Sequence, residues 1–119
     1  MIYSAKAKRK IVAALAEQYS GATLRIFSGE KPLSPELSVR SDEIASLLFP
    51  SKIEAAEKLV VTIEDNRTKG EGVPKWFRVT SRDGSTIADG SIGDGEDLQM
   101  PGYIPAGARV FVEDFTVEP

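Results

Sequence analysis

Residues 75–89 carry the strongest local signal in this chain: two short segments with strand character, joined by an Asp-Gly pair. Lys75–Thr80 is rich in aromatic and β-branched residues, Thr86–Asp89 follows, and Asp83-Gly84 lies between them. An Asp-Gly pair in this place favours a tight turn, because glycine readily adopts the positive φ that such turns require. The pattern therefore predicts an antiparallel β-hairpin with a positive φ at Gly84.

Trp76 and Phe77 are adjacent in the first strand of this hairpin. Neighbouring residues of a strand point to opposite faces of the sheet. We therefore expect one of the two rings to anchor the core. The other must then be covered by the helix, by a loop or by a partner.

Other segments have the same strand character and are separated by residues typical of turns. They are Thr23–Phe27, Leu37–Arg40, Leu59–Ile63 and Arg109–Glu113, the last continuing through Phe115 and Val117. Gly90–Asp97 and Pro101–Gly107 are rich in turn residues and are expected to be loops. Short strands at this spacing are typical of an antiparallel β-sandwich or barrel.

One helix is predicted at the start of the chain, from Ser4 to Tyr19. Ser4 can cap its first turn, and Gly21 stands where a glycine commonly follows a helix. The apolar stripe predicted for this helix consists of Ile11, Leu15 and Tyr19, with Val12 beside them. The chain is therefore expected to be a single domain over 1–119, with a helix in 1–21 and a β-rich body in 22–119.

The middle of the chain is ambiguous. Asp42–Phe49 fits either a short helix stopped by Pro50 or a strand, and Ile53–Lys58 has slightly helical propensity. The fold expected is mainly β with one N-terminal helix, and an α+β fold is the alternative.

The residue types of common catalytic centres are missing. The 119 residues include no cysteine and no histidine, which excludes thiol catalysis, thiolate metal sites and the common serine triad. Gly93-Asp94-Gly95 begins like a dinucleotide-binding fingerprint, but position 98 is leucine and the segment lies between predicted antiparallel strands. We expect no enzyme activity, no catalytic residue and no cofactor.

The acidic residues of the last third do not match a metal-binding loop. They are Asp83, Asp89, Asp94, Glu96 and Asp97, and their spacing differs from that of a calcium loop. Most of them stand near glycines, where turns commonly use aspartate, so no metal site is expected. The acidity of this region also argues against direct binding of nucleic acid. No apolar run approaches the roughly 20 residues of a membrane-spanning helix.

Charge is unevenly distributed along the chain. Residues 1–40 hold seven Lys/Arg and three Asp/Glu, a net charge of +4, whereas residues 41–119 hold eight and fifteen, a net charge of −7. The first turns of the predicted helix carry four cations: Lys6, Lys8, Arg9 and Lys10. Cations there oppose the helix dipole. We therefore expect these four residues to face an acidic surface, in this chain or in a partner.

The hairpin is part of a longer pattern over Lys75–Gly93. A Trp-Phe-Arg strand and an Asp-Gly turn are followed by a short strand ending in Asp-Gly, then a small residue, an aliphatic residue and glycine. Asp97-Leu98 and the alternating strand within 106–112 follow. Together with a helix and the strand Ala22–Phe27 near the start, this pattern resembles a family of small virion proteins of tailed bacteriophages.

This resemblance implies a non-enzymatic structural protein located in the virion, which is assembled in the host cytoplasm. The most specific expectation is a capsid decoration, or cement, protein that bridges subunits of the major capsid protein. A component of the neck, tail or baseplate is the alternative, with other virion proteins or further copies of the chain as partners. A carbohydrate-binding module is a further alternative, for which the candidate aromatic residues are Trp76, Tyr3, Tyr19 and Tyr103.

Overall fold

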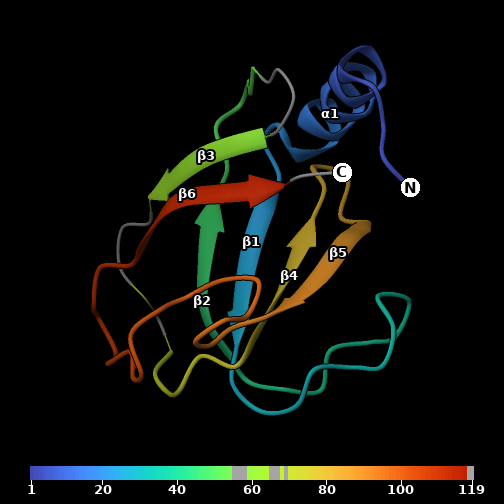
Figure 1. The fold of residues 1–119 in the computed structure, drawn as a ribbon. Coiled ribbons are helices and arrows are strands. Elements are labelled where there is room, and N and C mark those ends of the chain that lie inside the picture. The colour runs from blue at the N-terminus through green and yellow to red at the C-terminus, as the bar shows by residue number, and fades with distance from the viewer. Residues whose placement is uncertain (55–58, 65–67, 69, 118–119) are drawn as a thin grey trace.

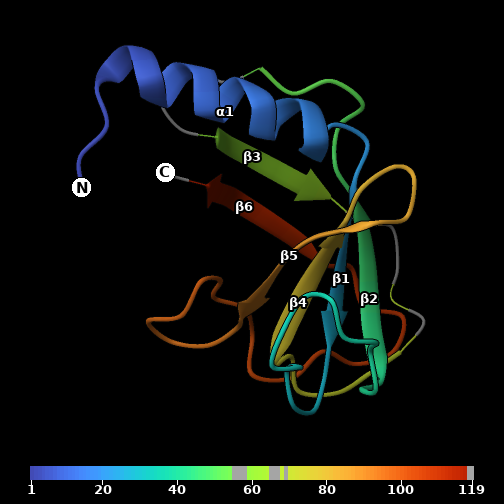
Figure 2. The same cartoon turned by 90° about the vertical axis from the view of Figure 1, so that its right-hand side faces the viewer.

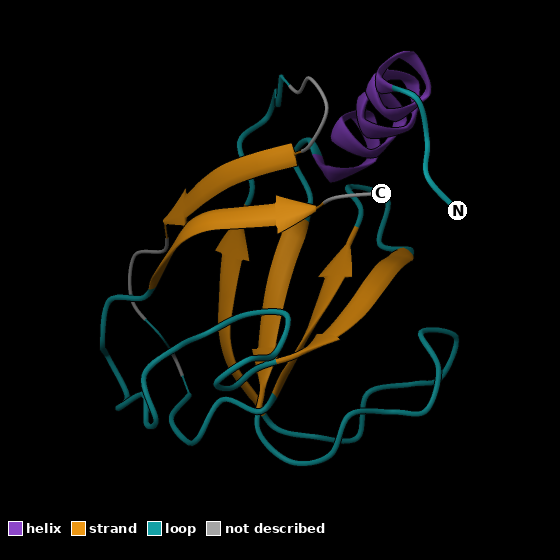
Figure 3. Ribbon diagram, viewed as in Figure 1, coloured by secondary structure: helices purple, strands orange, loops and turns teal. Residues whose placement is uncertain are grey.

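The strands form two antiparallel sheets, and a helix packs beside the smaller one (Figure 1, Figure 3). The computed structural model describes residues 1–54, 59–64, 68 and 70–117. The elements are α1 (Ala5–Tyr19), β1 (Thr23–Phe27), β2 (Glu43–Leu48), β3 (Leu59–Glu64), β4 (Trp76–Thr80), β5 (Thr86–Ser91) and β6 (Phe111–Val117). The larger sheet has the order β2-β1-β4-β5, and the smaller one pairs β3 with β6. The mainly β fold with one N-terminal helix is confirmed.

The helix and both sheets share one apolar core. In Figure 1, β3 and β6 cross in front of the strands of the larger sheet. The core side chains include Leu24, Ile26, Phe77 and Val79 from the larger sheet, Ile63, Val112 and Phe115 from the smaller, and Val12, Ala16 and Tyr19 from α1. The ring of Phe115 lies at the centre of an aromatic cluster, with its centroid 5.4 to 6.1 Å from those of Phe49, Phe77 and Tyr19. The contacts with Phe49 and Phe77 are edge-to-face, an arrangement that adds to the stabilisation from apolar burial.

The helix begins where its sequence predicted. The Ser4 hydroxyl accepts a hydrogen bond from the Ala7 backbone at 3.1 Å, as an N-cap does. The buried face differs from the predicted stripe: Val12, Ala16 and Tyr19 are buried, whereas Ile11 and Leu15 are only half-buried. The buried face is therefore shifted by one position, from Ile11 and Leu15 to Val12 and Ala16, while Tyr19 remains part of it.

The ambiguous segment is resolved as a strand. β2 pairs with β1 over five residue pairs, from Thr23↔Leu48 to Phe27↔Glu43, and this pairing satisfies its backbone. The short edge strand predicted at Leu37–Arg40 is wrong: these residues belong to a connection without strand structure that lies against the larger sheet. The helical propensity of Ile53–Lys58 concerns mainly 55–58, which lie outside the described residues.

β5 extends two residues beyond its predicted end. Gly90 was expected to begin a turn, but it pairs with Phe77 inside the sheet. A Cβ atom at Gly90 would lie only 2.2 Å from the Phe77 ring, so the glycine makes room for that ring. The closing strand β6, by contrast, begins at Phe111 rather than at Arg109.

Trp76 and Phe77 lie on opposite faces, and both are buried. Phe77 belongs to the main core. Trp76 is covered on the other face, where its ring stacks on Phe27 with centroids 4.4 Å apart and its indole N–H donates to the Ser41 hydroxyl at 3.2 Å. The cover is therefore the connection between β1 and β2, one of the possibilities that the sequence left open.

A buried ion pair lies beside Trp76 on this outer face. Arg78 donates two hydrogen bonds to the carboxylate of Asp89, at 2.7 and 2.9 Å, and a third to the Leu37 carbonyl at 2.8 Å. The Arg78 and Asp89 side chains are only 6% and 5% exposed. The bond to Asp89 raises the pKa of Arg78 above its ordinary value. The guanidinium thus joins β4, β5 and the connection 28–42.

Gly84 in the hairpin turn has a φ of 91°. The space around it is open, with no atom within 4 Å of a Cβ placed there. Gly84→Val is therefore expected to destabilise the protein by more than about 1 kcal/mol through backbone strain alone. Urea denaturation measures the change. Gly102→Val is the matched control, because Gly102 is equally open and has no positive φ. Equal stability of the two variants would contradict the turn geometry.

Candidate functional site

The four cations at the start of α1 are held away from the body. The first buried residue of the helix is Val12, so the turns before it extend beyond β3 (Figure 2). Lys6, Arg9 and Lys10 are exposed and Lys8 is half-buried. None of the four forms an ion pair with another described residue. The acidic surface expected for them is therefore not provided by ion pairs within the described part of the chain. We call residues 1–10 the basic overhang.

Replacing the four cations by glutamine is expected to keep or raise the stability of the isolated protein. The first turn holds no acidic residue, so the cations oppose the helix dipole without compensation. The midpoint of thermal unfolding of the quadruple variant, followed by circular dichroism, checks the prediction. A clearly lower midpoint would mean that these side chains stabilise the fold itself.

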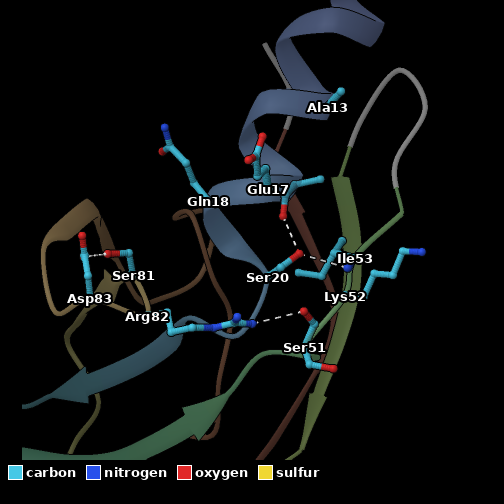
Figure 4. A pocket seen from close by; sticks show the side chains of 11 residues that line it. Ala13, Glu17, Gln18, Ser20, Ser51, Lys52, Ile53, Ser81, Arg82 and Asp83 are labelled. Carbon is cyan, nitrogen blue, oxygen red and sulfur yellow. Dashed lines mark hydrogen bonds between the residues drawn. The ribbon is translucent and has the colours of Figure 1, made fainter.

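A pocket of about 680 Å³ lies between the end of α1, residues 51–53 and the β4–β5 turn (Figure 4). The Ser20 hydroxyl donates to the Ala16 carbonyl at 2.7 Å and accepts from the Ile53 backbone at 3.0 Å. Arg82 crosses the backbone of Gly21 and donates to the Ser51 carbonyl at 3.3 Å. These polar groups are bonded within the chain, so they tie the helix end to the larger sheet. Sequence reasoning did not identify this pocket, because its parts come from three distant segments.

Asp83 at the rim of this pocket is a turn residue. Its carboxylate accepts hydrogen bonds from the hydroxyls of Ser81 and Ser85 and from the Ser85 backbone. These bonds lower the pKa of Asp83 from 3.8 to about 2. The carboxylate therefore stays ionised at neutral pH and stabilises the turn rather than exchanging protons with a ligand.

The stabilisation by Asp83 is expected to depend on pH. Because the pKa of Asp83 is lower in the folded state, the contribution is present above pH 3.8 and is lost as the pH falls through about 2. Asp83→Asn should therefore be less stable than the wild type at neutral pH. The difference in unfolding midpoint should close in acid, and a constant difference would contradict this role.

A second surface lies on the loop before β6. A groove of about 230 Å³ is lined by Met100, Pro101, Tyr103, Ile104, Pro105 and residues 108–111, of which Arg109 carries charge. Tyr103 and Phe111 at this groove are 53% and 59% exposed. The Tyr103 hydroxyl donates to the Glu71 carboxylate at 2.7 Å, and this bond raises the pKa of Tyr103. We call this surface the Tyr103–Phe111 patch. The sequence predicted a loop here, but not an apolar surface.

The remaining candidates of the sequence do not form a site together. Asp89 is paired with Arg78, and Asp97 accepts a hydrogen bond from the Ser91 backbone at 3.0 Å. In the described residues, no three acidic side chains converge where a metal ion could be held. Trp76 and Tyr19 are buried, whereas Tyr3 and Tyr103 are exposed. No helix in the described part is long and apolar enough to cross a membrane.

Comparison of the chain with protein families, with curated proteins and with solved structures finds no significant match. The function is therefore argued from the surfaces described above and from the sequence pattern.

Proposed function

We propose that this protein is a non-enzymatic structural protein that acts by binding other proteins. Within that class, we propose a capsid decoration protein of a tailed bacteriophage that bridges subunits of the major capsid protein. The observation that carries the binding role is a pair of exposed surfaces of different character, the basic overhang and the Tyr103–Phe111 patch. The sequence pattern over Lys75–Gly93 supports the location in the virion.

The basic overhang is suited to contact an acidic protein surface. Its cations form no ion pair with a described residue, and they lie on a helix end that projects from the body. Opposite charge on a partner would both attract the overhang and relieve the unfavourable dipole interaction. The helix that carries it is anchored in the core of the body by Val12, Ala16 and Tyr19.

The Tyr103–Phe111 patch is suited to bury apolar area. Exposed aromatic side chains at a groove are typical of protein–protein interfaces. On a capsid, contacts of this kind with neighbouring subunits would oppose the separation of those subunits under internal pressure. Interfaces of roughly 1,600 Å² suffice for stable binding, and the symmetry of the shell repeats each of them.

A place in the neck, tail or baseplate would use the same surfaces and is the second candidate. The two candidates differ in copy number and in the consequence of losing the protein. The carbohydrate-binding alternative would need exposed aromatic side chains. Of its four candidate residues, Trp76 and Tyr19 are buried, so they do not support it.

Binding to particles that lack the protein tests the proposal. Phage particles assembled without this chain are mixed with increasing amounts of the purified protein and are then separated by sedimentation. A decoration protein is expected to bind to saturation at a fixed ratio to the major capsid protein. The quadruple glutamine variant of Lys6, Lys8, Arg9 and Lys10 should bind less tightly, most visibly at low salt. Absence of binding to the heads would overturn the decoration role.

A further inference from the structure

We propose that the connection between β1 and β2, residues 28–42, is a lid that opens while the rest of the protein stays folded. In Figure 2 this connection, coloured cyan to green, lies in front of β1 and β4. Opening uncovers Trp76 and Phe27 on the outer face of the larger sheet, residue types that are enriched at protein interfaces. The lid is a property of the chain itself and does not depend on a place in a virion.

The lid covers a completely buried surface without burying any residue of its own. Trp76 and Phe27 beneath it are 1% and 0% exposed. By contrast, every residue from 28 to 42 is exposed or half-buried, and the two leucines of the lid, Leu33 and Leu37, are 99% and 48% exposed. Segments with few buried apolar contacts open at a lower free energy than the core does. The lid is therefore expected to open separately from the core.

Polar contacts hold the lid closed. Two come from β4: the Trp76 indole N–H donates to the Ser41 hydroxyl at 3.2 Å, and Arg78 donates to the Leu37 carbonyl at 2.8 Å. The Ser41 hydroxyl also donates to the Glu30 carbonyl at 3.1 Å, which links the two arms of the lid. A cavity of about 920 Å³ remains between these arms. The lid therefore gains little stability from packing within itself.

The surface beneath the lid has contacts of its own that do not involve the lid. The Phe27 and Trp76 rings stack on each other with centroids 4.4 Å apart. The guanidinium carbon of Arg25 lies 5.0 Å from the centre of the Phe27 ring, and that of Arg78 lies 5.6 Å from the centre of the Trp76 ring. Each guanidinium is paired with a carboxylate of another strand, one on β2 and one on β5. Opening therefore breaks no contact within this row, and this keeps its free-energy cost below that of unfolding the sheet.

The base of the lid provides a hinge. The Ser28 backbone N–H donates to the Asp42 carbonyl at 3.1 Å, next to the pairing of β1 with β2. Gly29 follows with a φ of 77°, and glycine can change its backbone angles at little steric cost. A few loop residues of this kind can absorb the change in dihedral angles when a lid opens. The base can therefore stay paired while residues 29–41 move.

Hydrogen exchange of the full chain, followed by NMR, tests the lid. Trp76 is the only tryptophan of the chain, so its indole N–H gives a single signal from beneath the lid. After correction for intrinsic rates, this N–H should exchange at least about a hundredfold faster than the backbone amides of the central strand β1. Its exchange should also change little in sub-denaturing urea, because lid opening exposes less surface than global unfolding does.

Three substitutions separate lid opening from global unfolding. Pro35→Gly makes the open lid more flexible and removes no backbone hydrogen bond, so indole exchange should become about two- to tenfold faster. Pro101→Gly is the matched control, an equally exposed proline in the loop before β6, and should leave indole exchange unchanged. Val12→Ala creates a cavity in the core beneath α1. It should speed the exchange of the β1 amides by at least about tenfold and also leave indole exchange unchanged.

Three results would overturn the inference. The first is an indole N–H that exchanges with the rate and the urea dependence of the β1 amides. The second is a Val12→Ala variant in which both kinds of N–H exchange faster by the same factor. Either result would show that the connection opens only when the whole protein unfolds. The third is indole exchange that does not respond to Pro35→Gly, which would show that this N–H reaches water without movement of the lid.

Discussion

Trp76→Ala is expected to destabilise the protein by about 3–5 kcal/mol, and Phe77→Ala by a similar amount. The two rings lie on opposite faces of β4, and both are almost completely buried, at 1% and 5% exposure. Phe77 fills the main core against Phe115, whereas Trp76 fills the space under the connection 28–42 against Phe27. Each truncation therefore leaves a cavity that the neighbouring groups cannot fill completely.

Urea denaturation of both variants measures these losses. Trp76→Phe serves as a control, because it keeps an aromatic ring over Phe27 and removes only the larger indole and its bond to Ser41. It should cost clearly less than Trp76→Ala. If both alanine variants retained the stability of the wild type, the placement of β4 between two covered faces would be wrong.

Breaking the ion pair between Arg78 and Asp89 is expected to have an equally large effect. Both side chains are buried, and they share two hydrogen bonds of 2.7 and 2.9 Å. Asp89→Ala leaves a buried guanidinium without its counter-charge, and Arg78→Met leaves a buried carboxylate. Each change should cost about 3–5 kcal/mol.

The double variant Arg78→Met/Asp89→Ala separates the pair from its surroundings. It leaves no unpaired charge, so its loss of stability should be smaller than the sum of the two single losses. Additive losses would show that the two side chains do not interact energetically. Arg25 and Glu43 are the comparison, because this exposed pair on the same sheet should contribute less than about 1 kcal/mol.

The local elements were predictable from the sequence, because their signals are local. The Asp83-Gly84 turn, the Ser4 cap and the β-branched run after Leu59 each act through neighbouring residues. The segment 42–49 was not resolved, since its pairing with β1 decides between helix and strand. Which side chains of α1 are buried likewise depends on the body against which the helix packs, and not on the helix alone.

The contacts that Asp89 and Gly90 make with β4 could not be predicted from the local sequence either. Asp89-Gly90 resembles a turn in the sequence, yet Asp89 neutralises Arg78 and Gly90 accommodates the Phe77 ring. Both roles involve residues of β4, which stand 11 and 13 positions earlier in the chain. A strand with a charged residue and a glycine is stable here only because its neighbour supplies the complementary groups.

Of the candidate surfaces, one could be predicted from the sequence and two could not. The cations of the basic overhang could be identified from the sequence, because all four stand within residues 6–10 of one helical segment. The Tyr103–Phe111 patch could not, since its exposure depends on how the loop packs beside Glu71 and Gly72. The pocket of Figure 4 combines the helix end, residues 51–53 and the hairpin turn, which only the folded chain brings together.

The number of copies in purified phage particles tests the central proposal most directly. Staining intensity on a gel, relative to the major capsid protein, gives the ratio of the two chains. A decoration protein should be present in a fixed ratio to the capsid protein, on the order of hundreds of copies per particle, because the shell repeats its binding sites by symmetry. A ring of roughly a dozen copies or fewer would place the protein in the neck or tail and contradict the decoration role. Its absence from the particles would contradict any structural role in the virion.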